Sequence, residues 1–187
     1  MARRRTGSAG PGQGSGEGSP EPAGQGAGGQ RRRRPELTPA QRAMGLLVRR
    51  EHSRKELARK LEARGVDEAE AEATVARMAE AGWQDDDRFA VGLARMRSHA
   101  GYGPLRIRAE LSTHGLGDDA IRAAFEALAE AGDDDWLAVA RDLVRRRHGP
   151  GVADDLALRR KAADFLFRRG FGGDTVRAAT AFDIDEG

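Results

Sequence analysis

The 187-residue chain contains no cysteine, which excludes a disulfide scaffold, a cysteine-ligated zinc site and a thiol nucleophile, and fits a reducing compartment. No run of about 18 apolar residues occurs, so we expect no membrane span and a cytoplasmic protein. Residues 1–35 hold seven arginines and two glutamates, whereas the remainder holds 25 basic and 28 acidic side chains. A body with this slight negative charge is a poor nucleic-acid binder by bulk charge, although local patches can still bind.

Residues 1–36 are rich in Gly, Pro, Ser and Gln and nearly free of large apolar side chains. Such a segment cannot bury enough apolar surface to offset its conformational entropy, so we predict a disordered tail rich in Gly, Pro and Arg. Its glycines at 24, 26 and 29 match a dinucleotide-binding spacing, but that motif requires a preceding strand and a following helix, which are not predicted. The block Arg31–Arg34 either contacts phosphates or an acidic partner, or is a solvated domain boundary.

The rest of the chain contains three copies of one unit of about fifty residues, which is typical of a repeat protein. An offset of 50 superposes the segment from Leu57 to Val66 on the segment from Ile107 to Leu116. A further offset of 55 leads to a third copy around Leu166. These alignments predict repeats at residues 37–84, 85–132 and 133–187.

Each repeat is predicted to contain three short helices, because helix-capping signals precede apolar residues at helical spacing. Thr38 followed by Pro39 and Gln41 is typical of a capped helix start, and Ser53-x-x-Glu56 predicts a second capping box. No segment alternates apolar and polar residues over a useful length, so we expect no strand. Further helix starts are expected at Asp67, Asp85–Asp87, Pro104 and Asp133–Asp135, and further helices near 118–131, 155–169 and 174–182.

The inward-facing apolar residues of one repeat are too few for a comfortable independent core. Stacking of neighbouring repeats would bury the remaining apolar faces, which predicts an all-α, elongated and curved body. The large side chains expected to anchor it are Trp83, Phe89, Phe125, Trp136, Phe165 and Phe182.

The sequence contains no convincing catalytic or metal-binding motif. The two aspartate triplets could suggest a metal site, but adjacent carboxylates at a helix start diverge around its axis, so capping is the favoured interpretation. The four histidines form no pair with metal-ligand spacing, and no serine nucleophile elbow or phosphate-binding loop occurs. We therefore expect a non-enzymatic binding protein without catalytic residues, metal or cofactor.

Arginine is the residue type that recurs at equivalent positions of the second and third repeats, as in Arg95 and Arg145 or Arg97 and Arg147. Residues 136–187 hold ten basic and eight acidic side chains, which suggests a more electropositive C-terminal end. Solvated helix faces would explain the arginines equally well, and the single Tyr102 either stacks on a partner or packs between helices. The candidate partner-binding residues are Arg95, Arg97, Tyr102, Arg106, Arg108, Arg145, Arg146, Arg147, Arg168 and Arg169.

The string from Gly82-Trp-Gln-Asp-Asp-Asp to Ala90, followed by Gly101-Tyr-Gly-Pro and Glu110-Leu111, resembles the central motif of RecX proteins, and the resemblance covers about residues 40–182. It implies a modulator of the RecA recombinase that binds RecA filaments on single-stranded DNA along the filament groove. Such proteins commonly inhibit strand exchange, ATP hydrolysis and coprotease activity, with consequences for DNA repair and the SOS response. We expect a monomer. The insertion-like Gly149-Pro-Gly-Val-Ala departs from the pattern and leaves the last helix unplaced.

A direct DNA-binding module is the alternative, because three-helix units can resemble helix-turn-helix domains. Such a module would bind single-stranded or double-stranded DNA without a protein partner. The net negative charge of the body favours the filament regulator over this alternative.

Overall fold

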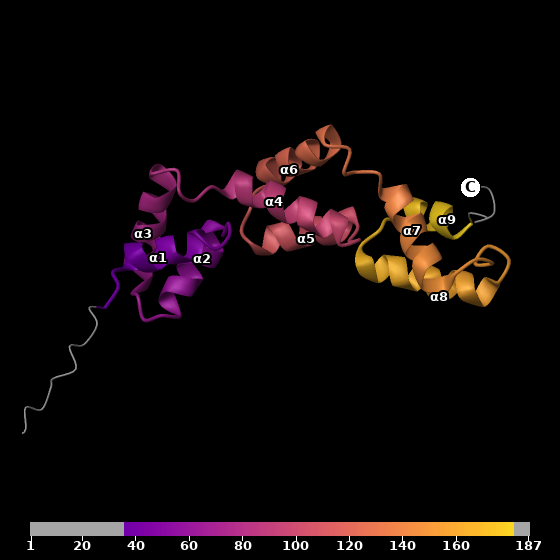
Figure 1. Cartoon of the computed structure of the whole chain (residues 1–187), viewed down its shortest axis with the longest axis horizontal. Helices are drawn as coiled ribbons and strands as arrows, with labels where there is room; N and C mark the ends of the chain where they lie inside the picture. Colours follow the sequence, from indigo (N-terminus) through magenta and orange to yellow (C-terminus); the bar gives the residue numbers. More distant parts are fainter. Residues whose placement is uncertain (1–35, 182–187) are drawn as a thin grey trace, which may run out of the picture. The chain divides into compact units, whose positions relative to one another are not determined.

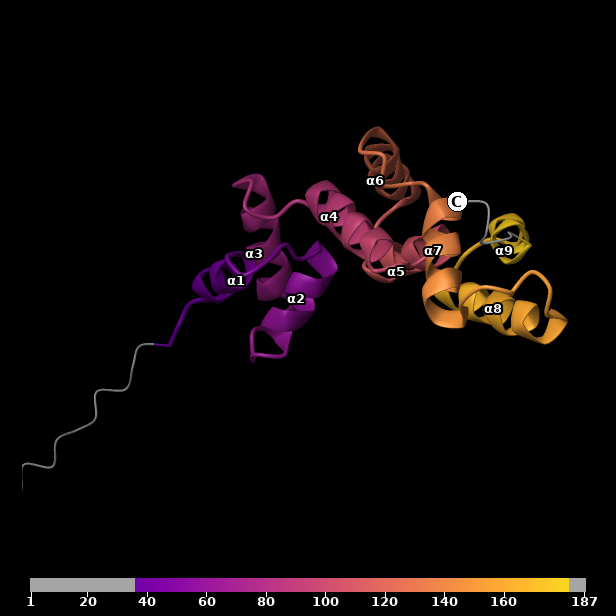
Figure 2. The same ribbon diagram turned by 45° about the vertical axis from the view of Figure 1, so that its right-hand side comes forward.

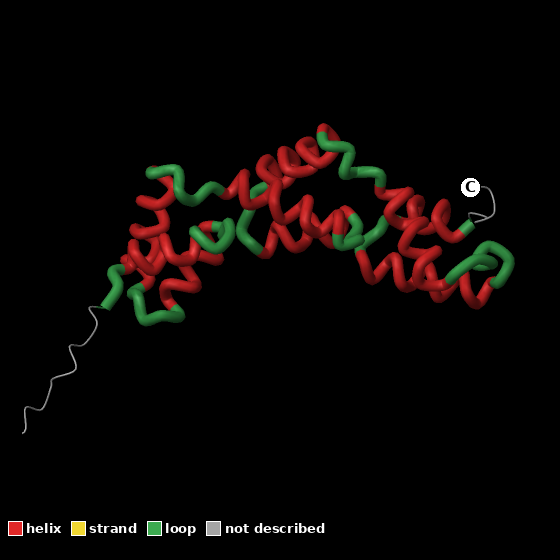
Figure 3. The backbone as a smooth tube through the Cα atoms, in the orientation of Figure 1, coloured by secondary structure: helices red, strands yellow, loops and turns green. Residues whose placement is uncertain are grey.

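The computed structural model describes residues 36–181, so the predicted tail up to Pro35 and the predicted anchor Phe182 lie outside the described residues (Figure 1). Within 36–181 the chain forms nine helices and no strand, which confirms the all-α prediction (Figure 3). We call α1–α3 repeat 1, α4–α6 repeat 2 and α7–α9 repeat 3. The helices are α1 Pro39–Leu47, α2 Arg54–Glu62, α3 Glu68–Glu80, α4 Asp86–His99, α5 Pro104–Thr113, α6 Asp118–Glu130, α7 Trp136–His148, α8 Leu156–Arg169 and α9 Gly173–Thr180.

The helix starts follow the capping signals with one exception. Thr38 and Gln41 form the complete capping box, and the side chains of Asp85 and Asp135 cap α4 and α7 by accepting backbone N–H groups. Ser53 caps α2 by accepting the Glu56 N–H, but the Glu56 side chain does not return a bond to complete the predicted capping box. The Glu56 carboxylate instead binds Arg50, whose charge competes better than a backbone amide for a buried carboxylate.

Each repeat has its own apolar core, in which the first helix packs against the third. Figure 2 shows the helices in a second view. The repeat-equivalent residues Leu61, Leu111 and Leu166 are completely buried, as the alignment predicts. The packing of α9 against α7 places the last helix, which the insertion after α7 left open.

Two aromatic side chains depart from the predicted anchors. Trp83 is 55% exposed, so its prediction as an anchor is wrong. Gly82 ends α3 with a positive φ, and after this turn the side chain of Gln84 fills the buried position and donates to the carbonyl of His52. Phe171, which was not among the predicted anchors, is 1% exposed and occupies the position that Val66 and Leu116 occupy in the other repeats.

Neighbouring repeats meet through a contact that recurs at both junctions. The start of α2 lies against the end of α5, and the start of α5 lies against the end of α8. At the repeat 1–2 junction, Ser53 Oγ lies 3.2 Å from His114 Nδ1, and Lys55 Nζ donates to the Thr113 carbonyl. At the repeat 2–3 junction, backbone hydrogen bonds take the place of these side-chain contacts, and the Arg169 side chain adds bonds to the carbonyls of Ala100 and Gly101. There the Gly103 N–H donates to the Arg169 carbonyl at 2.8 Å, and the Leu105 N–H donates to the Gly170 carbonyl at 3.0 Å.

The first helix of the following repeat adds to each junction in a different way. The Arg54 N–H donates to the Asp86 carboxylate at 2.9 Å at the repeat 1–2 junction. The equivalent residues at the repeat 2–3 junction are Pro104, which has no N–H, and Trp136, which has no acceptor. Trp136 packs against the apolar cores of both repeats 2 and 3, so an apolar contact replaces the hydrogen bond.

A buried ionic cluster in repeat 1 surrounds Glu56. Its carboxylate lies 2.5 Å from Arg50, 3.0 Å from His52 Nδ1 and 3.6 Å from Lys60. Burial raises the pKa of Glu56, but hydrogen bonds from Arg50 and His52 outweigh burial and lower this pKa to about 2. Burial lowers the pKa of His52, which the nearby Glu56 carboxylate only partly opposes.

We expect acid to destabilise the protein through this cluster. Because the folded-state pKa of Glu56 is about 2 and the unfolded value about 4.5, its stabilising contribution is complete above pH 4.5 and is lost between pH 4.5 and 2. That contribution is on the order of 3 kcal/mol. The lowered pKa of His52 acts in the same direction, since protonation of the unfolded chain below pH 6.5 favours unfolding.

Urea unfolding of the wild type and of Glu56→Gln at several pH values measures this effect. The glutamine variant should be less stable at pH 7, and its deficit should shrink as the pH falls below 4.5. A deficit that stays constant down to pH 2.5 would contradict the prediction.

Candidate partner-binding surface

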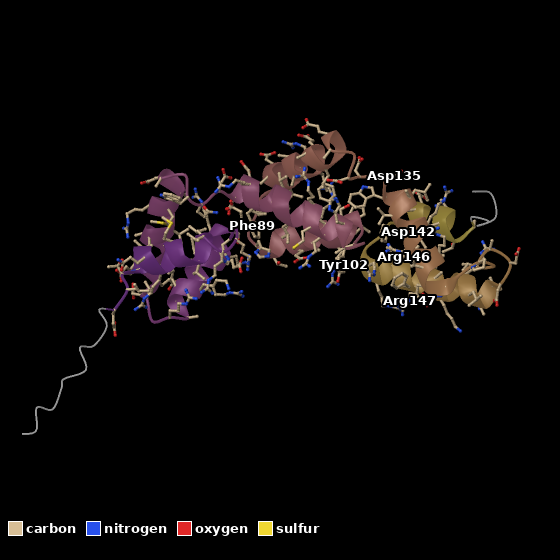
Figure 4. The ribbon with its side chains drawn as sticks, in the orientation of Figure 1. Phe89, Tyr102, Asp135, Asp142, Arg146 and Arg147 are labelled. Carbon is tan, nitrogen blue, oxygen red and sulfur yellow. The ribbon has the colours of Figure 1, made fainter. Side chains whose placement is uncertain are left out.

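Four of the predicted site residues meet at the repeat 2–3 junction, around the half-buried ring of Tyr102. Figure 4 labels Tyr102. The guanidinium carbons of Arg97, Arg106 and Arg169 lie 5.6, 5.8 and 5.2 Å from the ring centroid. These residues come from α4, α5 and the end of α8, so the junction assembles a cationic group that no single helix carries. A cavity of about 330 Å³ lies beside it, lined by Arg97, Tyr102, Arg106, Ala109, Glu110 and Thr113.

Arg97 and Arg169 have partners within the protein. Arg97 binds Glu110 through two bonds of 2.8 and 2.6 Å, and this hydrogen bonding raises the pKa of Arg97 and lowers the pKa of Glu110. Arg169 donates to the carbonyls of Ala100 and Gly101 at 2.9 and 3.1 Å. Both guanidiniums therefore hold helices and loops of the junction together.

Arg95, Arg145 and Arg146 are also paired with carboxylates. Arg95 Nε lies 3.1 Å from Asp133, which follows α6, whereas Arg145 and Arg146 share Asp142 on their own helix. The equivalent residues Arg95 and Arg145 thus make different contacts. Sequence reasoning missed Asp142, although its spacing of three and four residues from the two arginines is typical of ion pairs within a helix.

The second equivalent pair, Arg97 and Arg147, contacts a carboxylate in repeat 2 and an aromatic ring in repeat 3. Arg97 lies against Glu110, and the residue equivalent to Glu110 in repeat 3 is Phe165. The Arg147 guanidinium lies 4.7 Å from the centroid of the Phe165 ring. A ring binds a guanidinium face without neutralising its charge, so Arg147 remains cationic where Arg97 is compensated.

Among residues 36–181, four predicted arginines form no ion pair with a carboxylate, namely Arg106, Arg108, Arg147 and Arg168, although the charge of Arg106 helps to lower the pKa of Glu110. Arg108 covers the Phe125 ring at 4.2 Å, and Arg106 and Arg147 contact rings as described above. Counted over whole repeats, residues 37–84 hold nine basic and eight acidic side chains, and residues 133–187 hold ten and eleven. Repeat 3 is therefore not more positively charged than repeat 1, contrary to the expected gradient. Whether an arginine is paired with a carboxylate decides where positive charge is available on the surface.

The described part of the chain contains no group of three or more His, Asp or Glu side chains placed to hold a metal ion. No described helix is long and apolar enough to cross a membrane.

Comparison with known proteins identifies the same three units. Residues 41–78, 85–124 and 133–180 match the models of the domains described as RecX, first, second and third three-helix domain. A protein of Stenotrophomonas maltophilia named Regulatory protein RecX is 60% identical over 157 residues, which cover 83% of this chain and 94% of that protein. A protein of the same name from Xanthomonas axonopodis pv. citri is 58% identical over 155 residues, covering 83% and 93%.

Solved structures share the fold. The crystal structure of RecX from Lactobacillus salivarius superposes with a TM-score of 0.62 at 19% identity, covering 75% of this chain and 91% of that one. A second crystal structure, of a regulatory protein RecX, has the same TM-score at 18% identity and covers 77% and 72%.

Proposed function

Because the chain belongs to the RecX family of regulatory proteins, we propose that it binds the RecA recombinase filament on single-stranded DNA and inhibits strand exchange. Inhibition extends to the ATP hydrolysis and the coprotease activity of the filament. The observation that carries the proposal is the match of all three three-helix domains, in order, to RecX domains.

The candidate surface supports this function. Arg106, Arg108, Arg147 and Arg168 offer guanidiniums without carboxylate partners in the described residues, and they lie in the repeats that meet at Tyr102. A filament that carries a DNA strand presents regularly spaced negative charge to such a surface. A regulator that acts by binding needs this complementarity and no catalytic group.

We expect the purified protein to inhibit RecA-promoted strand exchange and single-strand-dependent ATP hydrolysis in a concentration-dependent manner. Co-sedimentation with preassembled filaments measures binding separately from inhibition. Unchanged rates together with an absence of co-sedimentation would contradict the proposed function, whereas co-sedimentation with accelerated exchange would reverse its sign.

A variant in which Arg106 and Arg147 are both changed to Ala should bind the filament more weakly, because it loses two exposed guanidiniums that form no ion pair within the described residues. Arg50 is unsuitable for a control in this assay, since its removal would leave the buried Glu56 carboxylate without its closest cation. Arg49→Ala and Arg59→Ala remove exposed charges of repeat 1 instead.

A further inference from the structure

Trp83 is a large apolar side chain that the fold leaves more than half exposed, although its main chain is held in place. Gly82, with a φ of 73°, turns the chain just before it. The Trp83 N–H donates to the Met78 carbonyl at 2.9 Å, and its own carbonyl accepts from Arg88 at 3.3 Å. Because the main chain that carries the indole is already ordered, a contact made by this ring requires little further ordering of the protein.

The equivalent residue of repeat 2 is used within the protein. Asp133 follows the equivalent glycine, and its carboxylate lies 2.8 Å from His99 Nε2 and 3.1 Å from Arg95 Nε. These contacts tie the end of repeat 2 back onto α4. In repeat 1 the buried position of the turn is filled by Gln84, so the fold leaves the Trp83 side chain without an equivalent internal role.

Carboxylates surround Trp83 along the chain. Residues 80–88 hold four acidic side chains and one basic side chain. Glu80 and Asp87 are exposed and form no ion pair within the described residues, whereas the single cation, Arg88, is bound to Glu51 at 2.5 Å. This negative charge repels the phosphates of a nucleic-acid strand and therefore disfavours stacking of a DNA base on the indole. It attracts a protein surface that carries basic side chains.

We propose that Trp83 anchors the chain to a protein partner by inserting its indole into an apolar cleft that basic side chains border. Tryptophan is among the residues that most often dominate the energetics of protein interfaces, where surrounding polar contacts keep water away from it. Glu80 and Asp87 supply carboxylates that complement the basic border of the cleft. The inference rests on the proposed function for the identity of the partner, namely the recombinase subunits of the filament.

Co-sedimentation of the full-length protein with preassembled filaments tests the inference. Trp83→Ala should weaken binding by about ten-fold or more, because truncation of a central aromatic anchor removes much of the interface energy. Trp83→Phe keeps an aromatic ring and should recover part of the affinity. Binding of Trp83→Ala to a labelled oligo-dT strand, measured by fluorescence anisotropy, should equal that of the wild type.

The matched control is Phe167→Ala, which removes another aromatic side chain that is 54% exposed, in repeat 3. We expect a clearly smaller loss of filament binding, because Phe167 is not the anchor. Since both side chains are exposed, urea unfolding followed by circular dichroism should give nearly the same midpoint for Trp83→Ala, Phe167→Ala and the wild type.

Reversal of one charge beside Trp83 gives a test in which the two kinds of occupant predict opposite signs. Glu80 is the last residue of α3, where a lysine suits the helix dipole, so Glu80→Lys should fold normally. A cleft bordered by basic side chains predicts weaker co-sedimentation with filaments. A DNA strand at Trp83 predicts stronger binding, both to filaments and to oligo-dT, and that result would overturn the inference.

Three further results would count against Trp83 as a protein anchor. They are co-sedimentation of Trp83→Ala like the wild type, an equal loss in Phe167→Ala, and an equal loss of Trp83→Ala binding to oligo-dT, which would place a base on the indole. The proposed function survives all three, provided that the wild type binds and inhibits the filament. A wild type that neither co-sediments nor inhibits strand exchange refutes the proposed function, and the inference fails with it.

Discussion

Leu111→Ala is expected to lower the free energy of unfolding by about 2–5 kcal/mol, because it removes a completely buried side chain and leaves a cavity. Leu111 belongs to the core of repeat 2 and lies on α5, the helix that contacts repeat 3 through its first turn. Repacking cannot easily fill the space, since the surrounding core consists of residues from all three helices of the repeat. Urea or thermal unfolding followed by circular dichroism measures the loss.

Leu105→Ala is the matched control, because it makes the same change on the same helix at a side chain that is 58% exposed. We expect a loss well below that of Leu111→Ala. Comparable losses for the two variants would show that the assignment of Leu111 to the core, and with it the alignment of Leu61, Leu111 and Leu166, is wrong.

Gly103→Ala should also destabilise the protein, by about 1–3 kcal/mol, through the repeat 2–3 junction. A Cβ atom on Gly103 would lie 2.6 Å from the Phe171 backbone nitrogen and even closer to the Gly170 carbonyl group, and backbone atoms cannot move aside cheaply. Separation of the two segments would break the hydrogen bonds from Gly103 to Arg169 and from Leu105 to Gly170. Faster hydrogen exchange of the Leu105 amide would report this loss directly.

Gly117→Ala separates crowding from the general effect of replacing a helix-capping glycine. Gly103 and Gly117 both precede a helix in extended backbone conformation, with φ of −81° and −76°. A Cβ on Gly117 meets no atom within 4 Å. We expect little change in stability for Gly117→Ala, and similar losses for the two variants would refute the role assigned to the close backbone contact.

Much of the fold follows from local signals in the sequence. Caps such as Thr38 and Asp85 satisfy amides within the same turn, so their role depends on residues only a few positions away. The burial of Gln84 in place of Trp83 could not be predicted in this way. It depends on the carbonyl of His52, which is distant in sequence, and on a turn at Gly82 that directs the polar side chain inward. The signal for Phe171 was present, because it follows the glycine equivalent to Gly65 and Gly115.

The candidate surface was less predictable for a related reason. Sequence reasoning identified the arginines but not their partners, and the partner decides whether a guanidinium is available. Arg97 and Arg147 are equivalent in the repeat, yet one faces a carboxylate and the other a ring. Only the contact between α8 and the loop at Tyr102 brings Arg169 beside Arg106, across more than sixty residues of chain.

The two junctions differ in how freely their sequences can change. Ser53 and His114 meet through side chains, so other pairs of polar residues can take over their contact with modest adjustment. Gly103 and Gly170 meet through main-chain atoms, and a Cβ on Gly170 would lie 2.5 Å from the Arg106 nitrogen. A larger residue at one of these glycines cannot be accommodated by a change of side chain at the other, because both are crowded by backbone atoms. Substitutions at Gly103 and Gly170 should therefore be tolerated less well among relatives than substitutions at His114.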